Sequence, residues 1–359
     1  MKESIGSGSF IIHLSSQHTL NITIQAIAIK RMKEIFLTVS ENLETLARIY
    51  EFPQRDKLSD SDTLLQDNQS TCIAKNGADT SRKALVIWGH GLNSGFSNED
   101  SEKIWNFWDT METELENKSL DVDVWRYFAR GHGSASAATS PLQCSWRQLG
   151  LDMLFVAEKA LRNAIVSNHC PLNLVLGGSS MGAASALHAI VAMKECADEL
   201  HCNTLEGCHL AGIILVIPPS CYGERLERSK RLMSAAKRSY NVNLIRKGRT
   251  LFPGHVPVET KHNIQPESYE NVMCGAAQSN FPSKESIQKA LEGVEVLILA
   301  WDCDDFVHPV STADILSNII SHADVRVAQG MTDLQSWPSI INDFIIRTVS
   351  KSEKAMSRI

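Results

Sequence analysis

The segment Gly178-Ser-Ser-Met-Gly182 follows an apolar run and precedes a helical pattern. A serine at a sharp turn between a buried strand and a helix exposes its hydroxyl, provided that the residues two positions before and after it are small enough for strand and helix to cross closely. Gly178 and Gly182 take those positions only if Ser180 is the central residue, because centring on Ser179 would place Met181 at the second. The spacing therefore favours Ser180 as a nucleophile. The alternative is that the same five residues form a tight glycine turn in which the serine has no catalytic role.

The helix expected to begin near Met181 supports that chemistry. The first amide N–H groups of a helix and the positive end of its dipole stabilise negative charge. An oxyanion that develops when Ser180 attacks an acyl carbon would form at this helix end.

The segments on either side of Ser180 indicate the architecture that must position it. From residue 84 onward, short apolar segments alternate with longer amphipathic ones, which is typical of a mainly parallel sheet with helices on both faces. Strands are expected at residues 84–88, 122–128, 172–176, 213–217, 294–300 and 325–328, and helices at 102–115, 146–167, 182–195, 312–320 and 339–349.

Two further regions differ from this alternation. We interpret residues 1–82 as an N-terminal extension to a domain that spans 83–359. Within the extension we expect strands at 10–14 and 20–29, a helix at 31–50 by its apolar spacing, and a polar, partly disordered linker from residue 53. Residues 218–284 contain no strand pattern and are too long for an ordinary connection, so we expect a cap of helices inserted over the sheet, with a merely ornamental surface insertion as the alternative.

Chemically capable residues follow several of the predicted strands. His90-Gly91-Leu92 follows the first, Arg130-Gly-His132-Gly-Ser the second, the Ser180 turn the third, and Trp301-Asp-Cys-Asp-Asp-Phe-Val-His-Pro309 the fifth. Because ligands bind outside the carboxyl ends of strands in open α/β sheets, these segments are expected to meet at one edge.

The order of these four motifs resembles the α/β-hydrolase superfamily over residues 84–346, and residues 218–284 fall where that family carries its cap. More narrowly, the segments around Ser180, Pro218 and His308 are similar to bacterial esterase-like members. The resemblance implies an α/β-hydrolase fold, an oxyanion hole made by the backbone amides of Leu92 and Met181, and Asp305 as the acid of a catalytic triad.

The chain departs from the family pattern at the triad histidine, which should follow the last strand. His322 is the last histidine of the chain, and it precedes that strand, which places it about 20 Å from Ser180 at ~3.3 Å per residue. A serine hydroxyl is a weak nucleophile without an adjacent base. We therefore rank His308 first as the base, His132 second and His90 third. The alternative is that His308 only packs against its neighbours or caps a helix. If His308 is the base, the carboxylates that could orient its ring are Asp302, Asp304, Asp305 and Asp333.

The composition of the chain limits which binding partners and which cellular compartment are expected. The chain carries a net charge of −6 and no basic tract interleaved with aromatic residues, which disfavours nucleic acid, and its apolar runs are too short for a membrane span. Nine scattered cysteines suit free thiols, and no secretory signal is evident, so the cytoplasm is expected, with organelle targeting by the N-terminal extension left open. Cys196, His201, Cys202, Cys208 and His209 lack zinc-site spacing, so neither a metal nor a cofactor is expected.

The sequence thus predicts a serine hydrolase acting on an ester or related acyl bond of a small apolar molecule. A non-catalytic binding or regulatory protein that has kept the fold and lost its base is the main alternative. A cofactor-free lyase or acyltransferase using the same serine is a third. The oligomeric state is left open.

Overall fold

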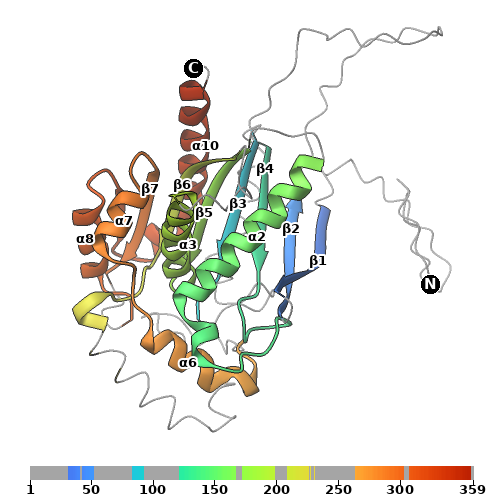
Figure 1. Cartoon of the computed structure of the whole chain (residues 1–359). Helices are drawn as coiled ribbons and strands as arrows, with labels where there is room; N and C mark the ends of the chain where they lie inside the picture. The colour runs from blue at the N-terminus through green and yellow to red at the C-terminus, as the bar shows by residue number, and fades with distance from the viewer. Residues whose placement is uncertain are drawn as a thin grey trace, which may run out of the picture.

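The computed structural model describes residues 31–40, 43–51, 83–92, 121–166, 172–198, 208–225, 227, 230, 263–302 and 307–356. These residues build one eight-stranded sheet in the order β1-β2-β4-β3-β5-β6-β7-β8 (Figure 1). Strands β4, β3, β5, β6, β7 and β8 run parallel to one another, and β2 pairs with β4 in the antiparallel sense. The predicted mainly parallel sheet is confirmed.

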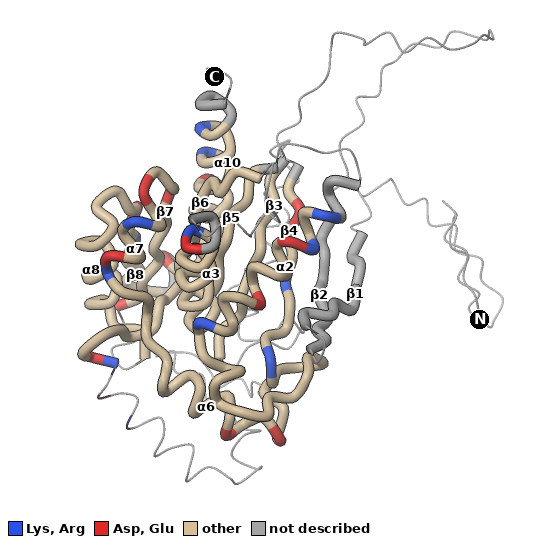
Figure 2. Tube along the Cα trace, viewed as in Figure 1, with Lys and Arg blue, Asp and Glu red and all other residues tan. Residues whose placement is uncertain are grey.

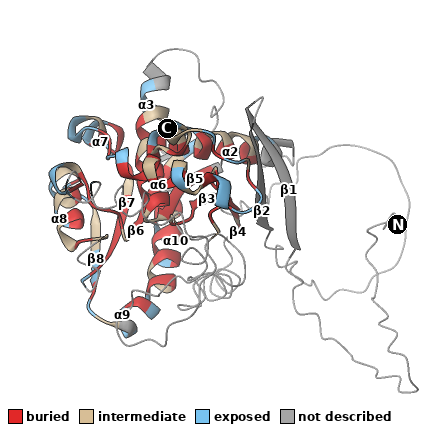
Figure 3. Ribbon diagram, turned by 90° about the horizontal axis from the view of Figure 1, so that it is seen from below, coloured by how far each residue is buried: buried red, intermediate tan, exposed pale blue. Residues whose placement is uncertain are grey.

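Each strand expected in the domain is present. The bounds are β3 Lys83–Gly89, β4 Asp121–Tyr127, β5 Leu172–Ser179, β6 Cys208–Val216, β7 Glu295–Trp301 and β8 Asp324–Ala328. Their near-continuous apolar composition matches their position, because a parallel strand is buried on both faces. Figure 3 shows this burial as a red centre between the helices.

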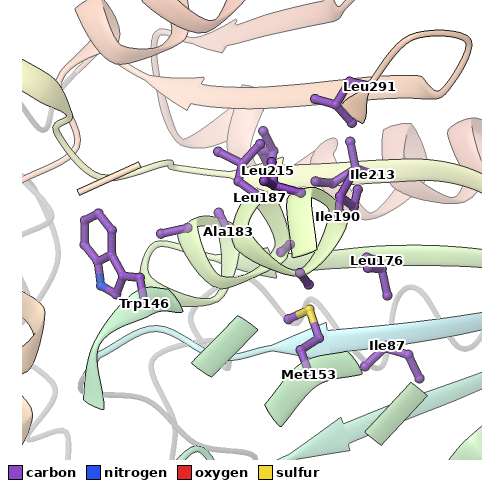
Figure 4. Close-up of a cluster of buried hydrophobic side chains, with 14 of the residues drawn as sticks. Ile87, Trp146, Met153, Leu176, Ala183, Leu187, Ile190, Ile213, Leu215 and Leu291 are labelled. Carbon is purple, nitrogen blue, oxygen red and sulfur yellow. The ribbon is translucent and has the colours of Figure 1, made fainter. Parts of the chain in front are cut away.

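Helices cover both faces of the sheet. On one face lie α2 Trp146–Val166, α3 Met181–Asp198, α7 Lys284–Ala290 and α8 Val310–Ile319, and on the other lies α10 Trp337–Met356. Met153, Leu187 and Leu176 belong to the core on the first face, part of which Figure 4 shows. Phe344 and Ile341 of α10 pack on the second face. The helix expected at 102–115 lies outside the described residues.

The expected helix at residues 31–50 is wrong. The chain there forms two antiparallel strands, β1 Arg31–Ser40 and β2 Leu43–Glu51, and β2 pairs with β4 from Ala47 to Tyr50. The apolar residues of this segment fit a period of two as well as a helical spacing, as Ile35, Leu37 and Val39 show. Its β-branched and aromatic residues also favour a strand. Pairing with the edge of β4 decides between the two periods. The strands expected at 10–14 and 20–29 lie outside the described residues.

The described parts of the expected cap form two segments beside the carboxyl edge. Residues 222–225 are helical, and after residue 262 the chain forms a bridge at Ile264, a short 3-10 helix η4 Pro266–Ser268 and α6 Tyr269–Gln278. Helix α6 contacts the 3-10 helix η2 Pro141–Cys144, which follows β4. The assignment of 218–284 as a cap stays a prediction.

Three glycines allow β3, β5 and α3 to cross closely. A Cβ placed on Gly182 would lie 2.0 Å from the carbonyl oxygen of Gly89, and one on Gly178 would lie 2.5 Å from the same oxygen. The obstacle in both cases is a backbone atom, which no side-chain rotation can move. The first turn of α3 therefore rests directly on the end of β3.

We expect Gly182→Ala to destabilise the protein by about 1–3 kcal/mol or more, because its methyl group would overlap the Gly89 carbonyl. Gly223→Ala is the matched control, since a Cβ there meets nothing within 4 Å. Urea unfolding of both variants measures the difference. Equal stability of the two variants would contradict the close crossing.

Candidate active site

Ser180 is a single residue between β5 and α3, and its backbone is left-handed, with φ 51°. Non-glycine residues rarely adopt this conformation, and strained positions of this kind gather at functional sites. The Ser180 amide donates to Val216 O at 2.9 Å, and Ser180 O accepts from Ala184 N at 3.1 Å, which begins the helix. The backbone is thus held on both sides while the side chain is left to project from the turn.

His308 meets the Ser180 side chain from the neighbouring part of the edge. Its Nε2 atom lies 2.7 Å from Ser180 Oγ, and both residues are half-buried. If Nε2 accepts the hydroxyl proton, the ring must carry its own proton on Nδ1. The loop that holds His308 is fixed by Ser220 N, which donates to Val307 O at 3.1 Å, and Pro309 then leads into α8.

The carboxylates named for orienting His308 fall in different places. Asp304 and Asp305 lie outside the described residues. Asp302 directly follows β7, and its backbone N donates to Ala328 O at 3.0 Å. Asp333 lies on α9 Met331–Gln335, and its Oδ2 accepts from Gln329 N at 2.8 Å.

The turn after β3 is held by His90. Its Nε2 accepts from Ala129 N at 2.9 Å, so Nδ1 carries the ring proton and donates to Gly91 O at 2.7 Å. Gly91 C=O belongs to the same planar peptide unit as Leu92 N–H, and the two bonds point in opposite directions. His90 therefore turns the Leu92 amide away from its own ring.

His132 is buried beside this turn and does not point its ring nitrogens at Ser180. Its Nε2 lies 2.6 Å from Leu92 O and its Nδ1 lies 2.9 Å from Arg130 O. Its ring centroid lies 4.8 Å from that of His90. Burial lowers the pKa of His132 and lowers that of His90 to about 3, with the neighbouring His132 as a second cause for His90. Both rings are neutral at ordinary pH and are committed to backbone groups.

One residue of this network was missed in the sequence. Asp152, buried on α2, binds the Arg130 guanidinium through two hydrogen bonds of 2.7 and 2.8 Å. Its only sequence signal is an acidic residue within the apolar pattern of a predicted helix, and nothing in that signal names Arg130 as its partner. The pair anchors the start of the His132 loop to α2.

His322 lies at the opposite edge of the sheet, as its place before β8 predicts. Its Nε2 bonds to Val294 O, just before β7 begins, and it lines a hollow of about 440 Å³ with Lys289 and Glu292. This hollow is remote from the carboxyl ends of the strands, so it is not part of the Ser180 site.

The described residues also bear on metal binding and membrane insertion. Among them, no group of three or more histidine, cysteine or acidic side chains is placed to hold a metal ion. No helix in the described part of the chain is long and apolar enough to cross a membrane. Over the described elements, basic and acidic residues are interspersed (Figure 2).

Comparison with solved structures supports the architecture. The chain is similar to a thermophilic esterase from Thermogutta terrifontis, with 15% identity, a TM-score of 0.52, and 89% of this chain and 98% of that one covered. It is also similar to a carboxylesterase structure from Nitrososphaera gargenis, with 14% identity, a TM-score of 0.52 and coverage of 89% and 100%. A provisionally assigned aryl esterase from Burkholderia cenocepacia gives 11% identity, a TM-score of 0.53 and coverage of 89% and 100%.

By sequence, no protein-family model and no curated protein matches the chain. At these identities the structural matches establish the fold and leave the activity open. The chain has an α/β-hydrolase fold, as the four strand-end motifs predicted.

The low pKa of His90 predicts a loss of stability in acid. The unfolded chain binds the His90 proton below its ordinary pKa of 6.5, whereas the folded chain resists it down to about 3, so the free energy of unfolding falls as pH drops through that window. We expect His90 to contribute about 2 kcal/mol of loss between pH 7 and pH 5.

Urea unfolding of the wild type and of His90→Asn at both pH values isolates this contribution. His132 contributes a loss of the same sign to both proteins, because its pKa is also lowered. A smaller loss in the variant is expected. The same loss in both proteins would show that His90 is not held neutral.

Proposed function

We propose that this chain is a serine hydrolase that cleaves an ester or related acyl bond of a small apolar molecule. The observation that carries the proposal is the 2.7 Å separation between Ser180 Oγ and His308 Nε2. A nucleophile and a base within hydrogen-bond reach are the first geometric requirement of this chemistry. The similarity of the fold to esterases supports the same class of reaction.

The proposed reaction starts when Ser180 Oγ attacks the acyl carbon and His308 Nε2 takes the hydroxyl proton. The Leu92 and Met181 amides would stabilise the oxyanion. Met181 begins α3, and the first N–H groups of a helix have no partner within it. His308 then returns the proton to the leaving alcohol, and water repeats the sequence to release the acid. Asp305 would orient the imidazole by accepting a hydrogen bond from Nδ1–H, without taking that proton.

A base after β7 in place of one after the last strand agrees with the contacts of the described residues that follow these two strands. The residues after β8 enter α9, where Gln329 N donates to Asp333, so this connection forms a helix start. The loop after β7 brings its histidine to the serine. Because a triad is defined by geometry and roles, a base from another strand end serves equally well.

A fluorophosphonate probe tests whether Ser180 is activated. We expect the wild type to be labelled and Ser180→Ala to lose the label, because phosphonylation requires a positioned hydroxyl whose proton an adjacent base takes as the oxygen attacks phosphorus. Ser179→Ala is the matched control, since Ser179 ends β5, and it should keep the label. A folded wild-type protein that takes no label would favour the non-catalytic binding protein.

Hydrolysis of short-chain p-nitrophenyl esters tests the base. His308→Ala should lower kcat/KM by about 10²- to 10⁴-fold, the usual contribution of a general base. His322→Ala serves as the control, because its ring lies at the other edge of the sheet and bonds to Val294 O. Unchanged activity in the His308 variant would refute the assignment.

A further inference from the structure

We propose that His132 is a positioning residue of the oxyanion turn, which holds the Leu92 carbonyl and so fixes the Leu92 amide in the direction that catalysis needs. The inference rests on the proposed function, because it assigns a supporting residue to the same site. It gives His132 a role other than that of a catalytic base.

The carbonyls on both sides of Leu92 are held by imidazole rings. The preceding one, Gly91 O, lies 2.7 Å from His90 Nδ1, and the following one, Leu92 O, lies 2.6 Å from His132 Nε2. Leu92 N–H is in the first of these peptide units. Rotation about either backbone bond of Leu92 would therefore break one of the two hydrogen bonds.

The His132 ring itself has little freedom. It is 1% exposed, and both nitrogens face carbonyl oxygens, while a neutral imidazole carries only one proton. The shorter of the two contacts is the one to Leu92 O, so we place the proton on Nε2. Burial lowers the pKa of His132, which keeps the ring in this neutral form at ordinary pH.

The loop that carries His132 is secured from two sides. Arg130 is bound to Asp152 of α2. On the other side, residues 263–265 pair with the loop as an isolated bridge, in which Gly133 N donates to Asn263 O and Gln265 N donates to Gly131 O. His132 thus connects helix α2 and the segment before α6 to the turn that holds Leu92.

Substitution of His132 by glutamine or by asparagine separates a role in positioning Leu92 from a role in packing alone. Glutamine can place an amide donor near the position of Nε2, so His132→Gln should keep the bond to Leu92 O. Asparagine can reach only the position of Nδ1, so His132→Asn should lose that bond. We compare the fluorophosphonate labelling rate and the kcat and KM of the two variants with the wild type, after checking each fold by circular dichroism.

His132→Asn is expected to lower kcat and the labelling rate by about 10- to 100-fold with little change in KM, which is below the ~10²- to 10³-fold effect of removing an oxyanion donor itself. His132→Gln should recover most of the loss. Equal rates in wild type and His132→Asn, or equal losses in both variants, would overturn the inference while leaving the Ser180 reaction intact. A wild type that takes no label would instead overturn the proposed function, and this inference with it.

If His132→Asn does not fold, ¹⁵N NMR of the imidazole groups decides, with His132→Gln used to assign the signals. The expected spectrum has a protonated Nε2 and an unprotonated Nδ1 for His132. The opposite tautomer would overturn the inference, because Nε2 would then have no proton with which to donate a hydrogen bond to Leu92 O.

Discussion

The close crossing of β3, β5 and the first turn of α3 is the constraint on which the site depends. Gly182 and Gly178 lie against the Gly89 carbonyl with no room for a Cβ. This crossing forces a one-residue turn between strand and helix, and Ser180 takes it up in a left-handed conformation. The strain at Ser180 is offset by the burial of the apolar strands and helix on either side of it, and its hydroxyl projects toward His308.

The parallel sheet brings the other groups to the same place because all of its parallel strands end at one edge. The loops after β3, β4 and β7 contribute different kinds of support. The first carries the Leu92 amide, the second holds that turn through His132, and the third brings His308 to the serine. Two imidazoles that are bound to backbone carbonyls and one that is bound to a hydroxyl thus have different chemical roles in one small region.

Much of this arrangement could be predicted from local sequence patterns. The strands could be predicted because buried parallel strands are continuous apolar runs. The turn could be predicted because the glycine spacing around Ser180 selects the candidate nucleophile. The hairpin at residues 31–51 was not, because its apolar residues fit both helical and strand periods and pairing with β4 decides. Asp152 was missed since its partner depends on where α2 crosses the β4 loop. The proximity of His308 to Ser180 likewise depends on tertiary structure, because the spacing of residues along the chain does not fix where His308 lies. Asp305 stays a prediction.

The most direct test of the account is a crystal structure of the fluorophosphonate adduct. The account predicts that phosphorus is bonded to Ser180 Oγ, that His308 Nε2 stays within about 3.2 Å of the adduct, and that the phosphoryl oxygen accepts from the Leu92 and Met181 amides. An adduct on another residue would contradict it. So would a phosphoryl oxygen turned away from both amides, or a different imidazole in the place assigned to His308.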